Sequence, residues 1–228
     1  MNAKALLSKS DLVSREYKRF LLLGMTVGGL ACSMWFLGAT AASAHHPFGG
    51  ATPSNFIQGF LSGVGHPLIG PDHFAFIIAV GLLAAVKKQG MIIPVTFVLA
   101  GLAGAGLHLA GFNLPAPEFF VSASVLLFGG LLALKQSPKV GVIAALAAIA
   151  GLFHGFAYGE AIFGAEMTPL VSYLMGFTLV QMGVAVAAFK AAQAITKKAA
   201  EQPLAPLRFV GFAISGAGAA FLSSVVLG

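Results

Sequence analysis

The stretch GHPLIGPDHFAF, residues 65–76, places two histidines and an aspartate among helix-breaking prolines and glycines. Imidazole and carboxylate together suit divalent transition metals such as Ni²⁺, Co²⁺, Zn²⁺ and Cu²⁺. A carboxylate can also fix the tautomer of a histidine that binds the metal. We therefore predict that His66 and His73 are metal ligands. Asp72 either binds the metal, orients a histidine or only caps the helix that follows.

The surroundings of this stretch are strongly apolar, since the chain of 228 residues is 58% hydrophobic and 9% charged. Its mean hydropathy is +0.92. A soluble fold could not bury so much apolar surface, so the composition predicts an integral membrane protein. The net charge of +6 does not indicate a nucleic-acid partner, because the basic residues are scattered rather than gathered in a patch.

Residues 1–44 have the pattern of a cleaved signal peptide, with a basic start, an apolar run and AASA before His45. An uncleaved anchor helix is the alternative, because the apolar run is long for a signal. Cleavage would remove the only cysteine, Cys32, and leave residues 45–228 as one transmembrane domain. His45 and His46 would then form either an outer capture site for a metal or a simple linker.

The apolar runs after residue 45 predict an all-α membrane protein with six transmembrane helices. We expect the first span to be broken between Gly65 and Pro71, with a helix on each side over 55–64 and 74–86. The others are expected at 91–110, 118–134, 140–155, 169–191 and 208–226, close to the ~20 residues that cross a bilayer. All basic residues after position 45 follow spans one, three and five. The positive-inside rule therefore places these loops in the cytoplasm of a bacterial inner-membrane protein, with both mature termini outside.

The remaining histidines and nearly all acids fall in the outer half of this topology. Ionisable groups in a membrane usually mark a binding site or pathway. We therefore add His154, Glu160 and Glu118 to the candidate metal ligands. Glu118 begins a helix, where a carboxylate is favoured in any case, and His108 is expected at headgroup level. The inner half offers few polar side chains, so the sequence shows no exit path.

Two motifs resemble those of the HupE/UreJ family, whose members are associated with hydrogenase and urease gene clusters. HPLIGPDH resembles the family's His-x5-Asp-His motif, and FHGFAYGEAIFGAE resembles a second family motif, which is roughly Phe-His-Gly-x-Ala-(His/Tyr)-Gly-x-Glu. The resemblance implies a secondary nickel or cobalt permease that serves metalloenzyme maturation. It carries over His66, Asp72 and His73 from the first motif and His154 and Glu160 from the second. Tyr158 stands where some members have a further histidine.

We therefore expect inward transport of a divalent transition metal, Ni²⁺ or Co²⁺, with no prosthetic group and no enzymatic activity. A membrane-bound metal-dependent hydrolase, with Glu160 as its general base, is an alternative. A metal sensor or storage protein facing the periplasm is another. The expected partners are the metal ion and the lipid bilayer. Glycines repeated every fourth residue, as at Gly151, Gly155 and Gly159, could pack helices within one subunit or in a homo-oligomer.

Overall fold

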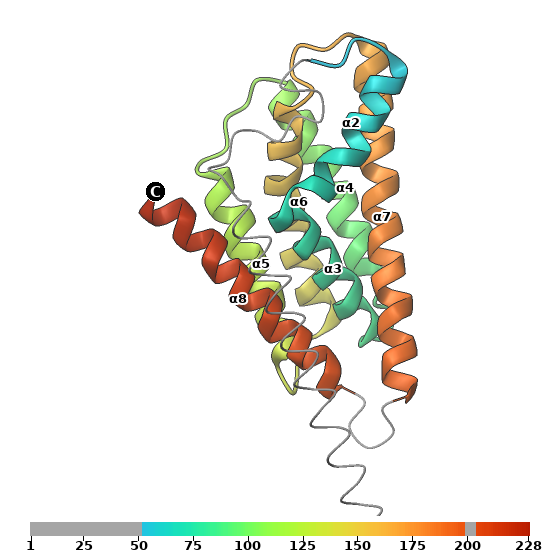
Figure 1. The fold of residues 1–228 in the computed structure, drawn as a ribbon, viewed down its shortest axis with the longest axis vertical. Coiled ribbons are helices and arrows are strands. Elements are labelled where there is room, and N and C mark those ends of the chain that lie inside the picture. The colour runs from blue at the N-terminus through green and yellow to red at the C-terminus, as the bar shows by residue number, and fades with distance from the viewer. Residues whose placement is uncertain (1–51, 199–203) are drawn as a thin grey trace, which may run out of the picture. The chain divides into compact units, whose positions relative to one another are not determined.

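The computed structural model describes residues 52–198 and 204–228, and every regular element in these ranges is an α-helix (Figure 1). The all-α prediction is confirmed for this part of the chain. The expectations for the signal peptide, Cys32, His45 and His46 lie outside it. The helices are α2 (Phe56–Ile69), α3 (Pro71–Ala85), α4 (Ile92–Leu109), α5 (Pro117–Ala133), α6 (Val140–Glu160), α7 (Met167–Lys198) and α8 (Ala205–Leu227).

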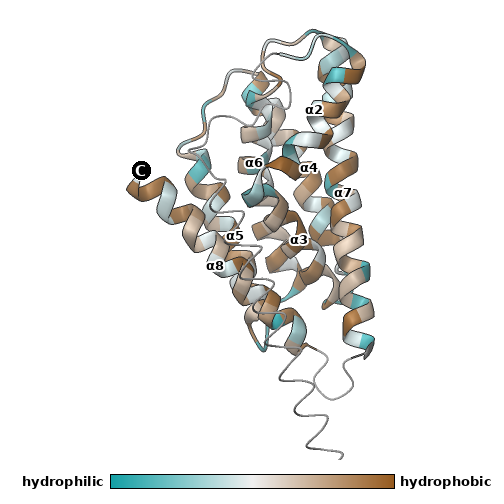
Figure 2. Cartoon of the chain, viewed as in Figure 1, coloured by the Kyte–Doolittle hydropathy of each residue, from teal (hydrophilic) through white to brown (hydrophobic). Residues whose placement is uncertain are grey.

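Length and hydropathy identify this as a membrane protein. The helices α4, α6, α7 and α8 are each long and apolar enough to cross a bilayer. The pair α2 and α3 meets the same criteria together, although the two are bent by 79° at their junction. Helix α5 is apolar but has 17 residues, just short of that length. Brown, hydrophobic residues dominate the helices in Figure 2, and exposed ones such as Leu99, Ile149 and Phe212 give the bundle a surface suited to lipid.

The break in the first span is narrower than the sequence indicated. Helix α2 continues through His66 and Pro67 as far as Ile69, so the expected end near Gly65 is wrong. Pro67 lies in the last turn, where its missing N–H costs only one intrahelical hydrogen bond. The helix stops at Gly70, whose ψ of 109° is extended. The second helix begins at Pro71, the far end of the expected break, since proline is favoured at the first helical position.

The helices pack in pairs through glycines. Helix α4 lies against α6, where Gly155 meets the backbone of Gly101. Helices α2 and α3 follow one another along α7, and α5 pairs with α8 (Figure 1). Such contacts let backbones approach closely, which favours association of membrane helices. The glycine repeats therefore pack helices within one subunit, which is one of the two roles that the sequence left open.

Helix α6 is longer than expected, because it continues past Gly155 to Glu160. No proline interrupts this segment, and Gly159 packs on the side chain of His108 in α4. His154 therefore lies six residues inside α6, about 9 Å from its end. The sequence had placed His154 at the end of its helix, and this expectation is wrong.

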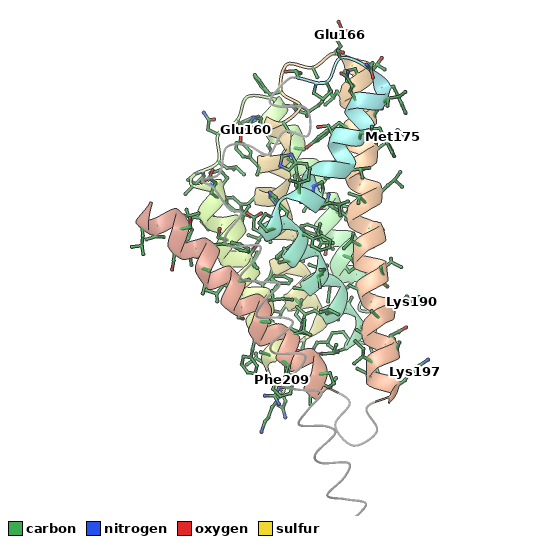
Figure 3. The ribbon with its side chains drawn as sticks, in the orientation of Figure 1. Glu160, Glu166, Met175, Lys190, Lys197 and Phe209 are labelled. Carbon is green, nitrogen blue, oxygen red and sulfur yellow. The ribbon has the colours of Figure 1, made fainter. Side chains whose placement is uncertain are left out.

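Charged residues separate along the helices. Figure 3 shows Glu160 and Glu166 at the opposite end from Lys197. At the basic end, Lys87 Nζ donates to Ser137 O at 2.9 Å, which ties the α3–α4 loop to the α5–α6 loop. We call this the lysine end and the other the acidic end. The predicted gathering of the basic loops on one side is confirmed for the residues described.

Candidate functional site

Three histidines, the histidine cluster, meet where α2, α3 and α6 come together. His66 lies in the last turn of α2 and His73 in the first turn of α3, so the break at Gly70 brings their rings to 5.8 Å between centroids. His154 reaches them from α6, and its Nδ1 lies 2.8 Å from Nδ1 of His73. Both members of this pair are buried. Sequence reasoning named all three, and the structure brings them together.

Gly70 permits this arrangement by having no side chain. A Cβ at this position would lie 2.7 Å from Cδ2 of His73 and 3.3 Å from Oδ1 of Asp72. The carboxylate of Asp72 accepts a hydrogen bond from the backbone N–H of His73 at 2.8 Å. Asp72 therefore acts on the first turn of α3, which favours its capping or orienting role.

The partners of His154 assign its tautomer. Ser124 on α5 donates its single hydroxyl hydrogen to Val121 O at 2.6 Å. Its oxygen lies 2.9 Å from His154 Nε2 and must therefore accept a hydrogen bond from Nε2–H. Nδ1 of His154 then carries no hydrogen and presents a lone pair. The hydrogen between the His73 and His154 rings is therefore bonded to Nδ1 of His73.

Two tyrosines border His66. Tyr173 on α7 donates its hydroxyl hydrogen to the carbonyl of Tyr158 at 2.8 Å, so its oxygen can accept from Nδ1 of His66 at 3.3 Å. The ring of Tyr158 lies 4.5 Å from that of His73 and 5.1 Å from that of His66. The Tyr158 hydroxyl is buried and has no hydrogen-bond partner among the described residues. A buried polar atom without a partner is uncommon and marks a place where a missing group could bind.

One helical turn further toward the lysine end, the polar site gives way to the phenylalanine cluster of Phe76, Phe97 and Phe128. The ring of Phe76, on α3, lies 4.4 Å from that of His154. It also lies 5.0 Å from Phe97 and 4.7 Å from Phe128, and all three side chains are fully buried. These rings close the site on the side that faces the lysine end.

Apart from Asp72, the other predicted ligands are exposed at helix ends or lie outside the described residues. Glu118, at the start of α5, and Glu160, at the end of α6, are exposed. His108 packs against Phe156 in the α4–α6 interface. Within residues 52–198 and 204–228, no three His, Cys, Asp or Glu side chains are arranged to hold a metal ion together. The assignment of a metal site to these residues stays a prediction.

Comparison with known proteins agrees with the sequence motifs. The family model described as "HupE / UreJ protein" matches residues 33–221. This chain belongs to the HupE/UreJ family. It is also 31% identical over 175 residues to Protein HupE of Rhizobium leguminosarum bv. viciae, an alignment that covers 72% of this chain and 85% of that protein. No solved structure matches the chain.

Sequence reasoning missed two residues of the site in this HupE/UreJ protein, Ser124 and Tyr173. Both lie in apolar spans and are buried. The signal that could have found them is a hydroxyl in a transmembrane helix, which tends to form a hydrogen bond with a neighbouring helix. Which neighbour it meets depends on helix rotation, which this sequence does not show.

Proposed function

We propose that this protein carries a divalent transition metal, Ni²⁺ or Co²⁺, into the cytoplasm through the histidine cluster. The observation that carries the proposal is the buried pair of imidazole nitrogens from His73 and His154, 2.8 Å apart, with His66 beside them. Membership of a family associated with hydrogenase and urease, two classes of metalloenzyme, supports the same substrate. The metal is cargo, and no prosthetic group is needed.

The spacing of the pair is close to what a metal requires. Bonds from a first-row metal to imidazole are about 2.0–2.1 Å, so two neighbouring ligand nitrogens lie roughly 2.9–3.4 Å apart for angles between 90° and 109°. His154 already presents its Nδ1 lone pair. His73 offers one once its proton moves to Nε2, as neutral imidazole allows. Small ring movements would then admit an ion between the two nitrogens.

The remaining predicted ligands fit supporting roles. Asp72 would orient His73 through the first turn of α3. Glu118 and Glu160, exposed toward the acidic end, would attract cations, and His45 and His46 would capture them after cleavage of the signal peptide. A hydrolase would need a general base at the metal, but Glu160 is exposed at the end of α6, about 9 Å along the helix from His154.

The proposed topology is six spans in a bacterial inner membrane, with α2 and α3 as one broken span. Helix α5 would be the short one, since its 17 residues extend about 25 Å against roughly 30 Å of hydrocarbon. The lysine end would face the cytoplasm by the positive-inside rule, and both mature termini would lie outside. A homo-oligomer is a separate proposal. The glycines already pack helices within one subunit, so they do not support it.

Metal uptake into proteoliposomes tests the proposal. We expect His154→Ala to lower nickel uptake by about 100-fold or more, because removing a ligand should cost at least as much as removing a residue that orients one. Ni²⁺, Co²⁺, Zn²⁺ and Cu²⁺ should be compared in parallel. The control is His108→Ala, a histidine of the α4–α6 interface, which should leave most uptake intact. Equal uptake by the wild type and by His154→Ala would exclude the histidine cluster as the metal path.

A further inference from the structure

A cavity of about 300 Å³ lies at the lysine end, bounded by the end of α5, the α3–α4 and α5–α6 loops and the start of α8. Three cationic side chains line it, Lys87, Lys135 and Arg208, each from a different segment. An adjoining hollow of about 600 Å³ shares Lys135 and Arg208 and extends along α8 to Phe212. In Figure 3, Phe209, the neighbour of Arg208, marks this end of α8.

Two of the cations are held in place by backbone carbonyls. Lys87 Nζ donates to Ser137 O at 2.9 Å, and Arg208 Nε donates to Ala133 O at 2.8 Å. Each contact uses one donor, whereas an ammonium group has three and a guanidinium group five. Donors therefore remain for a ligand. The described residues that line the two hollows include no aspartate or glutamate, so a bound anion would offset the repulsion among the cations.

The walls of the two hollows are mostly apolar. Leu131 and Leu207 are buried beneath the cations, whereas Leu134, Leu204 and Phe212 are 51%, 43% and 57% exposed. An inorganic anion would make no favourable contact with this apolar surface. A ligand with a negative headgroup and a hydrocarbon chain would match both parts, its charge at the cations and its chain toward Phe212.

We propose that this cavity binds an anionic phospholipid, with the phosphate at Lys87, Lys135 and Arg208 and one acyl chain along α8. Basic pockets between transmembrane helices commonly recognise such headgroups. The bound lipid would connect the α3–α4 loop, the α5–α6 loop and α8. This inference does not depend on the metal path, because its residues lie at the opposite end of α3 from the histidine cluster.

The test is lipid retention by the full chain, measured by native mass spectrometry after transfer from nanodiscs of phosphatidylglycerol or phosphatidylcholine. Phosphatidylglycerol should stay bound and phosphatidylcholine should not. Loss of one cation should weaken retention about fivefold, in Lys135→Gln and in Arg208→Gln. The control Lys197→Gln removes the same charge from an exposed position on α7 outside the cavity and should retain lipid as the wild type does.

Because Arg208 also bonds the end of α5, Lys135→Gln is the decisive variant. Equal retention by Lys135→Gln and Lys197→Gln would overturn the proposal, as would equal retention of the two lipids. Glycerol phosphate, added as a soluble competitor, should not displace the lipid. If glycerol phosphate alone bound as tightly as the lipid, the site would be one for free phosphate esters, and the acyl-chain part of the proposal would be wrong.

Discussion

The histidine cluster and the phenylalanine cluster are adjacent layers of the same bundle, yet they differ in almost every chemical respect. Helix α3 contributes to both, with His73 in one layer and Phe76 one turn later in the other. In the first layer, polar atoms from α2, α3, α5, α6 and α7 are joined by hydrogen bonds. In the second, the buried ring of Phe76 on α3 contacts those of Phe97 on α4 and Phe128 on α5. The side chains of the histidine cluster are therefore positioned by hydrogen bonds, whereas those of the phenylalanine cluster are positioned by the packing of their rings.

The difference bears on where a metal could go next. Nearer the lysine end, Thr96 Oγ1 donates to Ile92 O at 2.8 Å and Gln181 Nε2 donates to Phe177 O at 3.1 Å. The Oε1 atom of Gln181 is buried and has no hydrogen-bond partner among the described residues. In the described conformation, Phe76 and Phe97 pack directly against the ring of His154. Transport would therefore require the rings to move, and the break at Gly70 is the place where α3 could pivot.

Among variants that keep all three histidines, the largest effect is expected from disturbing the alignment of the histidine cluster. Gly70→Ala places a Cβ 2.7 Å from Cδ2 of His73, while the φ of −70° at this position is accessible to alanine. The ring of His73 must move, and the pair with His154 separates. We expect nickel uptake to fall on the order of 50-fold, since metal sites depend on orientation within fractions of an ångström.

The control for this variant is Gly106→Ala, because a Cβ there meets nothing within 4 Å. A thermal unfolding curve would establish that both proteins are folded. Normal uptake by folded Gly70→Ala would mean that the contact between His73 and His154 is not needed for transport.

A smaller effect is expected from removing the hydrogen bond that assigns the tautomer of His154. Ser124→Ala leaves Nε2 without its acceptor, so Nδ1 is no longer held as the lone pair. Loss of such an orienting partner typically costs about 10–100-fold in metal affinity, and we expect about tenfold in the KM of uptake. Ser124→Thr retains the hydroxyl and should restore affinity. Nitrogen-15 NMR of the imidazole should show a mixed tautomer in the alanine variant alone.

Ser122→Ala is the matched control, because Ser122 lies two residues away on α5 and is also buried, at 2% exposure against 7% for Ser124. If both alanine variants raised KM equally, the loss would reflect packing of α5 rather than the tautomer of His154.

The sequence predicted the helices well and the site only partly, for identifiable reasons. The apolar runs predicted both ends of α4, α5 and α8 to within three residues. They could do so because the hydropathy of a segment depends only on its own residues and not on its neighbours in the fold. Pro67 and Gly65 suggested a wide break, but a proline in the last turn is tolerated and only Gly70 leaves the helix. The motifs named the three histidines. Ser124 and Tyr173 could not be found, because their contacts depend on how α5 and α7 are rotated against the cluster.

The smallest functional effect is expected in the phenylalanine cluster, where no atom is suited to bind a metal. Phe97→Leu keeps an apolar side chain of different shape at a fully buried position. We expect it to lower the free energy of unfolding by about 1–1.5 kcal/mol and to leave the KM for nickel unchanged. Phe212→Leu, at an exposed site on α8, should change stability by less than about 0.5 kcal/mol. Denaturant titration and uptake kinetics check both. If Phe97→Leu raised KM as Ser124→Ala does, the two layers would form one functional unit, and the distinction between ligand chemistry and packing would fail.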